Sequence, residues 1–399
     1  MSTVEENQRF VTRLGASLMA TIAPSPTVDQ TLAEVGEKYG VRGQSAVLPR
    51  GAITIDRAAG SVVFEKKPRE YRLDQTEAVL DLVGRAGAGE VTAGQGLARL
   101  DEIDAMRPSV GAAGRFLGIV LIIVGLCLNQ NPGLHELIVA AALSVVTAAV
   151  STSLSHWGSL SLFSSTFVAF VATLPVAVLT SAGYLHVPAQ VIVPLLALFT
   201  QGAALTIAIL EISMGAMQTG VNRLIGSILQ LFLLAFGIIV AVSIAPTPHP
   251  TLTGADAELP IGIRFAGVLL YAIGACLAFC APRAAFGWLF LVIVVSWAVQ
   301  AGLAEVVPNG YAPSFVGALV GVAVAELVHR YLSGPAALVS LNQIFRILAP
   351  GGLTLLGVTS ATTHGSIGGT ADIGHLVFTF IAVALGMAAG HVLTDLRTA

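Results

Sequence analysis

Charged residues are scarce in this sequence, and those present are unevenly placed. Only 11% of the 399 residues are charged and 55% are hydrophobic, whereas about a quarter of the residues of a soluble domain carry charge. Of the 20 Lys and Arg and the 23 Asp and Glu, 28 lie within residues 1–110, including every lysine. The composition therefore predicts a polytopic membrane protein that is preceded by a soluble domain.

The sequence lacks the residues that several classes of protein function require. The net charge of −3 gives no excess of positive charge for nucleic acid, and no stretch has metal-ligand spacing or a phosphate-binding glycine loop. The first of the eight histidines is His135, so residues 1–110 offer no nucleophile–base–acid set. We therefore expect no enzymatic activity, no cofactor, no bound metal and no nucleic-acid partner.

Residues 1–110 combine helical and alternating patterns of apolar residues. The predicted helices are Val4–Ala20, Thr27–Tyr39, Asp74–Gly84 and Thr92–Met106, and the predicted strands are Ser45–Leu48, Ala52–Asp56, Ser61–Glu65 and Glu70–Leu73. A domain of this length can bury a core of its own. The pattern predicts an α+β domain.

Ten apolar segments after residue 110 approach the roughly 20 residues that a helix needs to cross a membrane. They are Ala112–Leu128, Leu134–Leu154, Leu160–Ala182, Ala189–Leu210, Val221–Ala245, Ile261–Ala281, Ala284–Leu303, Pro313–Leu332, Ala336–Val358 and Ile373–Leu396. The proline-rich loop Pro246–Pro260 divides them into five and five. Two consecutive units of five must run in opposite directions, which is the inverted-repeat construction of many secondary transporters.

We therefore predict an all-α polytopic membrane protein with an N-terminal α+β cytoplasmic domain. Its ten transmembrane helices would form two inverted five-helix repeats. The predicted domains are residues 1–110 for the cytoplasmic domain, 111–245 for the first repeat and 261–399 for the second.

The few basic residues at the ends of the apolar segments and in the turns between them indicate the orientation. Cytoplasmic loops of membrane proteins carry an excess of Lys and Arg. With the first domain inside, the cytoplasmic turns hold Arg223, Arg283, Arg330 and Arg397, whereas the opposite loops hold only Arg264. The distribution predicts that both termini are cytoplasmic.

Two apolar segments are interrupted at corresponding positions of the two halves. Gln201-Gly202 interrupts the fourth segment of the first half, and Pro350-Gly351 interrupts the fourth segment of the second. Broken helices in matching positions point to the substrate site of a transporter. The predicted substrate-binding residues are Thr200, Gln201, Gly202, Thr206, Glu211, Asn342, Gln343, Arg346, Pro350 and Gly351.

Three charged side chains within or near the apolar segments carry specific hypotheses. A guanidinium matches a carboxylate in bidentate geometry, so Arg346 is predicted to bind a substrate carboxylate, with an ion pair to Glu211 or Glu326 as the structural alternative. Glu211 can bind a substrate ammonium or a proton, or it can pair with Arg223 or cap the next helix. Glu326 is the second candidate for proton coupling, and a solvated pair with His329 is its alternative.

The order and spacing of several motifs resemble the threonine/serine exporter family of bacteria. These motifs are Ala172-Thr173-Leu174-Pro175, Pro188-Ala189-Gln190-Val191-Ile192, Glu211, Gly215, Gly220 and Arg223. The resemblance covers nearly the whole chain, since that family has a cytoplasmic head and two five-helix membrane domains. It implies export of small hydroxylated amino acids and related metabolites across the bacterial inner membrane, driven by an ion gradient.

Three positions depart from the pattern of that family. Glu211 stands where relatives usually carry aspartate, Gln201 replaces a proline, and Arg346 lies where an uncharged motif is expected. The function predicted is a secondary exporter of small polar amino acids or related metabolites, coupled to the proton gradient. Its partners would be a small-molecule substrate, membrane lipid and the proton, with homo-oligomerisation left open. A channel-like facilitator and a membrane-anchored sensor or scaffold are the alternatives.

Overall fold

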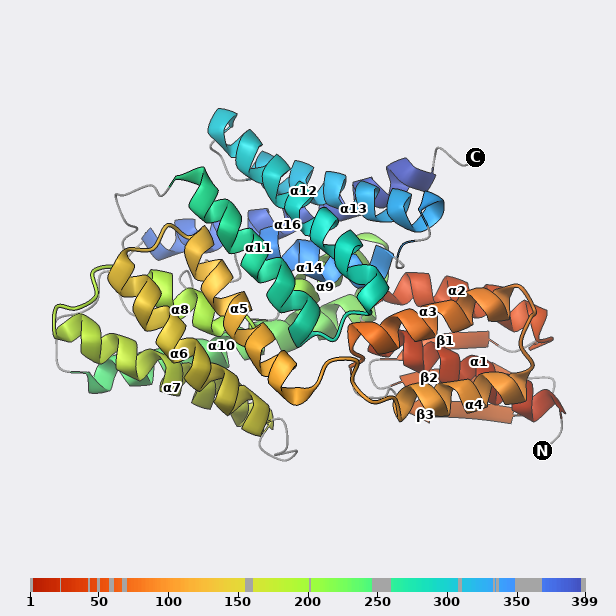
Figure 1. Ribbon diagram of the computed structural model, residues 1–399. Coiled ribbons are helices and arrows are strands. Elements are labelled where there is room, and N and C mark those ends of the chain that lie inside the picture. Colours follow the sequence, from red (N-terminus) through yellow and green to blue (C-terminus); the bar gives the residue numbers. More distant parts are fainter. Residues whose placement is uncertain are drawn as a thin grey trace.

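The chain is described by a computed structural model, in which a compact α+β part lies at one end of a bundle of long helices (Figure 1). The residues described are 3–21, 23–41, 44–48, 51–56, 61–66, 70–154, 161–200, 202–245, 260–307, 311–332, 334, 337–348 and 368–395.

The elements of the first part are α1 (Thr3–Ala20), α2 (Ser25–Lys38), β1 (Gln44–Leu48), β2 (Gly51–Asp56), β3 (Ser61–Lys66), α3 (Leu73–Gly87) and α4 (Ala93–Asp104). We call residues 3–104 the head. The remaining helices are α5 (Ala112–Asn129), α6 (Leu134–Leu154), α7 (Ser161–Ser181), α8 (Ala189–Leu196), α9 (Gly202–Ser213), α10 (Met217–Ile244), α11 (Ile261–Ala278), η2 (Arg283–Ala285), α12 (Phe286–Val306), α13 (Tyr311–Tyr331), α14 (Ala337–Leu348) and α16 (Gly368–Asp395).

The head folds around α1, which lies between the sheet and the other head helices. The sheet is an antiparallel meander in the order β1-β2-β3, with Ala52 opposite Val47 on one side and Glu65 on the other. A Cβ atom on Gly15 would lie 2.6 Å from Leu32 and 3.2 Å from the Cβ of Ala52, so glycine lets α1 approach both neighbours. The predicted α+β character of this part agrees with these elements.

The predicted strand Glu70–Leu73 is wrong. Among the described residues, 70–72 join no sheet, although the backbone of Arg72 is extended at φ −71° and ψ 166°. The amide of Tyr71 donates to the carbonyl of Ala20 at 3.0 Å, and the amide of Leu73 donates to the carbonyl of Phe279 at 3.1 Å. The segment therefore satisfies its backbone with helix ends rather than with a fourth strand.

Six helices within the described residues are long and apolar enough to cross a membrane. They are Ala112–Asn129, Leu134–Ser153, Met217–Ile244, Ile261–Ala278, Arg283–Val306 and Tyr311–Tyr331. Three shorter apolar helices accompany them, at Ser165–Ser181, Ala204–Ser213 and Ile381–Thr394. The chain is thus a polytopic membrane protein with a predominantly helical fold.

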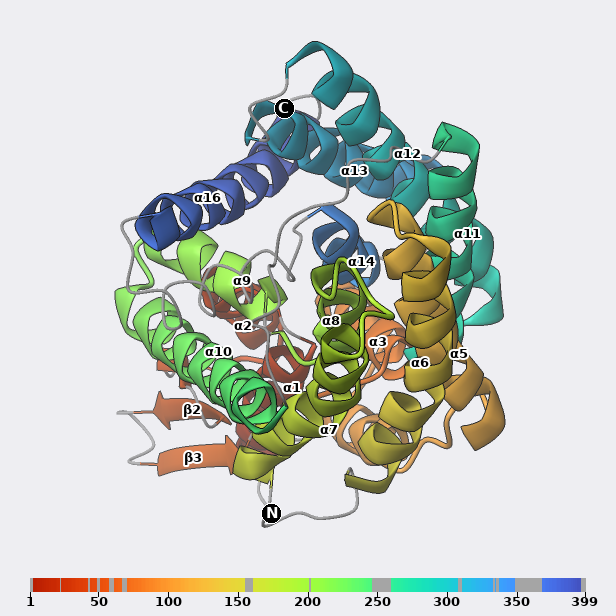
Figure 2. The ribbon, with the colours of Figure 1, turned by 90° about the vertical axis from the view of Figure 1, so that its left-hand side faces the viewer.

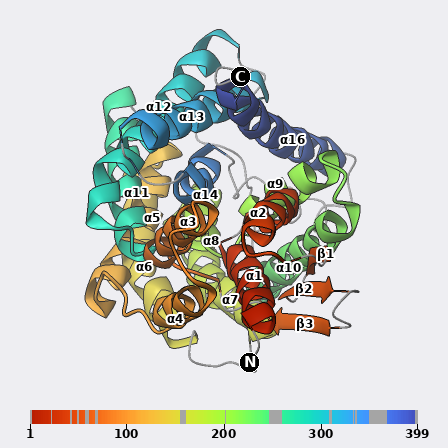
Figure 3. The ribbon, with the colours of Figure 1, turned by 90° about the vertical axis from the view of Figure 1, so that its right-hand side faces the viewer.

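The long helices surround two short ones. Figures 2 and 3, which view the bundle from its two ends, place α8 and α14 inside a ring of longer helices. The bundle is closed on one side by α5 and α11, which pack along each other through glycines. A Cβ atom on Gly125 would lie 2.5 Å from the carbonyl oxygen of Gly267, and one on Gly274 would lie 2.7 Å from that of Gly118. Small residues of this kind let membrane helices approach closely.

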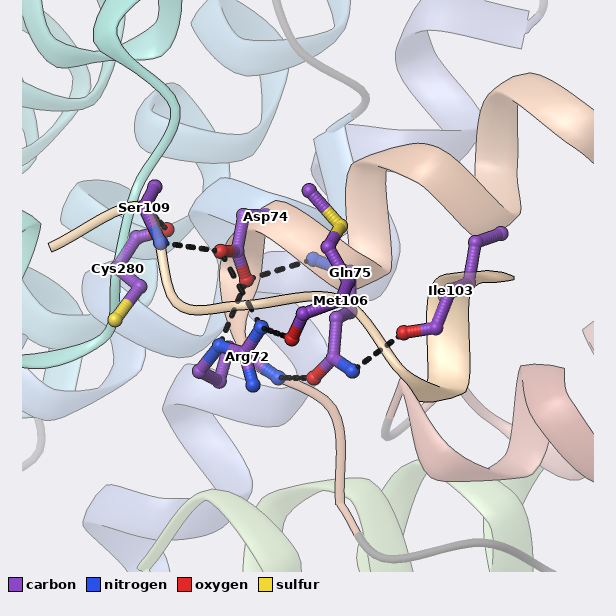
Figure 4. A network of polar contacts seen from close by, with 7 residues as sticks. All are labelled: Arg72, Asp74, Gln75, Ile103, Met106, Ser109 and Cys280. Atoms are coloured by element: carbon purple, nitrogen blue, oxygen red, sulfur yellow. Dashed lines mark hydrogen bonds and ion pairs between the residues drawn. The ribbon is translucent and has the colours of Figure 1, made fainter. Parts of the chain in front are cut away.

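The segment between the head and α5 is fastened by a buried carboxylate (Figure 4). Asp74, only 4% exposed, accepts hydrogen bonds from the amides of Gln75 at 2.9 Å and Ser109 at 3.0 Å. Arg72 pairs with the same carboxylate at 3.0 Å. The hydroxyl of Ser109 donates to the carbonyl of Cys280 at 3.1 Å, so the connection is attached to the turn after α11 as well as to the head.

On the side of α3 that faces the membrane helices, one carboxylate is incompletely paired among the described residues. Glu77 lies one turn from Leu73 and from Leu80. Both leucines pack against the ends of the membrane helices that lie beside the head. Its Oε2 is buried without a hydrogen-bond partner among the described residues. Burial raises the pKa of Glu77 above its ordinary value, and the neighbouring charge of Asp81 raises it further.

We expect Glu77→Gln to raise the thermal stability of the full chain at pH 7. Because the pKa of Glu77 is raised in the folded state, folding favours its protonated form, and stability falls as pH rises through the ordinary glutamate pKa and the raised one. The gain should therefore shrink on acidification and vanish where glutamate is protonated in both states. Unfolding scans in detergent at pH 4 and pH 7 measure it. Glu37→Gln, at an exposed position on α2, is the control, and an equal change in both variants would contradict the assignment.

Candidate functional site

The predicted interruption of the first half corresponds to a gap between two helices. α8 ends at Leu196 and α9 begins at Gly202, with the turn Ala197–Thr200 between them. The hydroxyl of Thr200 donates to the carbonyl of Ala197 at 2.8 Å and so satisfies one backbone acceptor that the break leaves free. Gln201, the other predicted member of this break, lies outside the described residues.

The corresponding helix of the second half, α14, ends inside the bundle. The carbonyl of Leu348, its last residue, accepts a hydrogen bond at 3.0 Å from the amide side chain of Gln300 on α12. The same amide donates to the hydroxyl of Ser314 on α13 at 3.0 Å. A side chain therefore caps α14 where a surface helix would meet water. Pro350 and Gly351 lie beyond this point, outside the described residues.

Arg346 lies in the last turn of α14, where the helix dipole favours a cation. Its guanidinium carbon stands 4.8 Å from the centroid of the Phe279 ring, a cation–π contact. Its Nε is buried without a hydrogen-bond partner among the described residues. The alternative of an ion pair to Glu211 or Glu326 is not observed, because both glutamates pair with other side chains.

Polar groups on α9 and α11 belong to the same interior as Arg346. Gln343, 2% exposed and one turn before Arg346, accepts a hydrogen bond at 3.3 Å from the hydroxyl of the buried Tyr271 on α11. Thr206 on α9 is 2% exposed, and its hydroxyl has no partner among the described residues. α9 packs against α14, and their apolar residues share one buried cluster.

The structure thus gathers three of the predicted site residues, Thr206, Gln343 and Arg346, on two packed helices. Tyr271 was not predicted, and the signal that could have found it is a single hydroxyl within the apolar α11. For Asn342 only the backbone is described, and it lies within α14.

A further hydroxyl that the sequence analysis did not assign lies on α7. Thr173, within the Ala172–Pro175 motif, is fully buried, and its hydroxyl has no partner among the described residues.

The second motif, Pro188–Ile192, has a structural role at the end of the bundle away from the head. The side-chain amide of Gln190 donates to the carbonyls of Gln130 at 3.2 Å and Asn131 at 3.0 Å, which holds the α5–α6 turn against α8.

Glu211 lies at the junction of the bundle with the head, not beside Arg346. Its carboxylate is fully buried and accepts hydrogen bonds from Arg223 at 3.0 and 3.2 Å. The backbone amide of Ser25, the first residue of α2, donates to it at 2.9 Å, and the hydroxyl of Ser25 lies 2.7 Å from that of Thr219. The predicted site residues therefore divide between an interior set and this junction.

Two glycines of the family-like pattern shape the turn that brings Glu211 to Arg223. Gly215 has a φ of +86°, a conformation that residues with a Cβ rarely adopt. A Cβ atom on Gly220 would lie 2.9 Å from the carbonyl oxygen of Ala208, so glycine lets α10 fold back against α9. The turn sets the guanidinium and the carboxylate side by side.

Glu326 is more buried than a solvated pair would be, and its predicted partner is wrong. It is 8% exposed on α13 and lies 2.8 Å from Nδ1 of His391 on α16, with Arg330 at 3.8 Å. Nδ1 of His329 instead lies 3.1 Å from the carbonyl of Gly334. The spacing of three residues had suggested His329, whereas the partner comes from another helix.

Comparisons with known proteins give one match. The family model ThrE, described as "Putative threonine/serine exporter", matches residues 9–245, more than half of the chain. No curated protein and no solved structure matches the chain. The matched residues contain most of the head, both motifs and the Glu211–Arg223 turn. This family is a class of exporters rather than of enzymes, and the chain belongs to it.

Proposed function

We propose that the chain is a secondary exporter of a small polar amino acid of the threonine or serine type, or of a related metabolite. The observation that carries the proposal is Arg346, a guanidinium inside the helix bundle whose Nε has no partner among the described residues. An arginine deep in the hydrocarbon region of a membrane costs about 3 kcal/mol on insertion scales, so a guanidinium inside the bundle calls for a ligand or a cavity. The α-carboxylate of an amino acid is such a ligand.

Neutral groups on α9, α11 and α14 suit the rest of an amino acid. The Thr206 hydroxyl can donate and accept, and the Tyr271–Gln343 pair offers both roles as well. Such groups can bind a substrate hydroxyl and ammonium without adding net charge. The remaining members of the proposed site are Thr200, Gln201, Gly202, Asn342, Pro350 and Gly351, at or beside the two interruptions.

The packing of the helices supports ten spans in two inverted repeats, residues 111–245 and 261–399. α7 packs along α10 as α13 packs along α16, and α6 packs against α8 as α12 packs against α14. Gly237 of α10 meets the carbonyl of Thr166 on α7, and Gly386 of α16 meets the carbonyl of Phe315 on α13. The first helices of the two halves, α5 and α11, pack against each other. Repeated pairings of this kind are expected of a duplicated unit.

The proposed orientation places the head and both termini in the cytoplasm of a bacterium, with the bundle in its inner membrane. Arg223 and Arg283 lie at the end of the bundle that contacts the head, which agrees with the excess of basic residues on the cytoplasmic side.

A cysteine at Thr251, in a chain whose three native cysteines are replaced, tests this orientation. We expect it to react with an impermeant maleimide added to intact cells. A cysteine at the exposed head residue Glu90 is the matched control and should react only after permeabilisation. Labelling of the Thr251 position from the cytoplasm alone would exclude the proposed topology.

Glu211→Gln tests proton coupling. A carboxylate at a restricted, low-dielectric site can exchange its charge for a proton, and glutamine cannot. We expect the variant to stay folded in the membrane but to lose threonine transport driven by a pH gradient in proteoliposomes. Glu326→Gln is the parallel variant, since Glu326 is the second coupling candidate. If Glu211→Gln keeps the pH dependence of the unaltered protein, Glu211 has no coupling role.

Arg346→Lys tests the carboxylate contact. Lysine keeps the charge but lacks the planar fork, so it loses a charge-assisted hydrogen bond worth about 1.5–3 kcal/mol. We expect the affinity for threonine to fall by roughly tenfold or more, while binding of threoninol, which lacks the carboxylate, changes much less. Arg283→Lys, at an exposed turn, is the control. Equal losses for the two compounds would rule out carboxylate binding.

A further inference from the structure

The head is attached to both halves of the bundle, not only to the helix that follows it in the chain. Ser25 of the head donates its amide to Glu211, which belongs to the first half, at 2.9 Å. Leu73 of the head donates its amide to the carbonyl of Phe279, which belongs to the second half, at 3.1 Å. Because one compact domain holds both contacts, it fixes the position of one half relative to the other.

The head also covers one end of the bundle. Figure 3, viewed from the head side, shows α1, α2 and α3 in front of the ring of membrane helices, with α3 close to α14. Leu73 of α3 packs with Cys276 and Val339, at the ends of α11 and α14 that lie beside the head. At this end of the bundle, the head therefore contributes to the burial of the described residues of α11 and α14, together with the neighbouring membrane helices.

The backbone amide of Ser25, at the start of α2, finds its acceptor in the membrane domain. Pro24, the N-cap residue of α2, makes no side-chain capping bond, so the first turn of α2 obtains an acceptor from the membrane domain. A carboxylate at a helix N-terminus is favoured by the helix dipole, and its hydrogen bond from an amide is charge-assisted. Glu211 thus caps a helix that lies 186 residues away in the sequence.

We propose that the head is a gate, which must leave Glu211 before the bundle can open toward the head side. The proposal rests on the proposed transport function, since alternating access moves one repeat against the other around the substrate. A rigid domain attached to both repeats opposes that movement while it is docked. Undocking of α2 from Glu211 frees the first half, and docking closes the path again.

The second contact leads from the head to the proposed substrate site. The carbonyl of Phe279 accepts from Leu73, and the ring of the same residue supports the guanidinium of Arg346. Movement of the head at Leu73 therefore moves the ring on which Arg346 rests. The geometry couples the gate to the residue proposed to bind the substrate carboxylate.

Substitution of Ser25 tests undocking without any substrate. Ser25→Pro removes the amide that donates to Glu211, while proline is well tolerated in the first turn of a helix. Ser25→Ala keeps that amide and loses only the hydroxyl contact with Thr219, so it is the matched control. The readout is alkylation of Cys280, which is fully buried beside Ser109, in chains whose other two cysteines are replaced. We expect at least a fivefold faster reaction in Ser25→Pro than in Ser25→Ala, and equal rates would overturn the gate.

A crosslink tests whether undocking is needed for transport. Ser25→Cys combined with Thr219→Cys, in a chain without native cysteines, places two thiols where the hydroxyls lie 2.7 Å apart. Threonine counterflow in proteoliposomes should fall more than tenfold on oxidation and return on reduction. Each single cysteine variant under the same oxidant is the control.

The two measurements separate the gate from the transport function. Unchanged counterflow in the fully crosslinked protein would overturn the gate while leaving the exporter function intact. If the reduced protein moves no threonine, the proposed substrate is wrong, and the alkylation rates alone decide the gate.

Discussion

Polar groups within an apolar bundle need partners, and this requirement governs how the chain is arranged. Neither a backbone carbonyl at a helix end nor a charged side chain can turn to water there. Gln300 supplies the partner for the end of α14, and Arg223 supplies the partner for Glu211. The head takes part in the same arrangement, because the amide of Ser25 completes the shell of the Glu211 carboxylate. The head and bundle are therefore joined by the satisfaction of polar groups as well as by apolar contact.

Arg346 differs from the two paired glutamates, Glu211 and Glu326. Glu211 lies 3.0 Å from Arg223 and Glu326 lies 2.8 Å from His391, whereas Arg115 and Arg264, like Arg346, have a buried Nε without a hydrogen-bond partner among the described residues. Arg346 has an aromatic ring beneath it, and its Nε has no partner among the described residues. An aromatic face stabilises a cation without neutralising it. In the proposed site, its Nε is therefore left to donate to a substrate anion.

Local patterns in the sequence were sufficient where the determining contacts are local. Apolar periodicity located the head helices and three strands within a few residues, and Gln201-Gly202 marked the gap between α8 and α9. Patterns failed where the partner is distant. Glu70–Leu73 looked like a strand because it is extended, but Phe279 and Ala20 take its hydrogen bonds. The partner of Glu326 is His391 and not the predicted His329, because spacing along one helix carries no information about a neighbouring helix.

If the two halves move against each other as proposed, the glycine contacts between α5 and α11 lie where the halves can separate least. Gly125 and Gly267 bring the backbones of α5 and α11 into contact, which leaves little room for one helix to move relative to the other at this seam. Relative rotation of the halves would then be small at the seam and larger across the bundle, where α9 meets α16. The head is joined covalently to α5, which is one of the two helices of this seam. The connection between the head and α5, residues 105–111, would therefore move little while α9 and α16 move more. A connection this short could then serve both the docked and the undocked head.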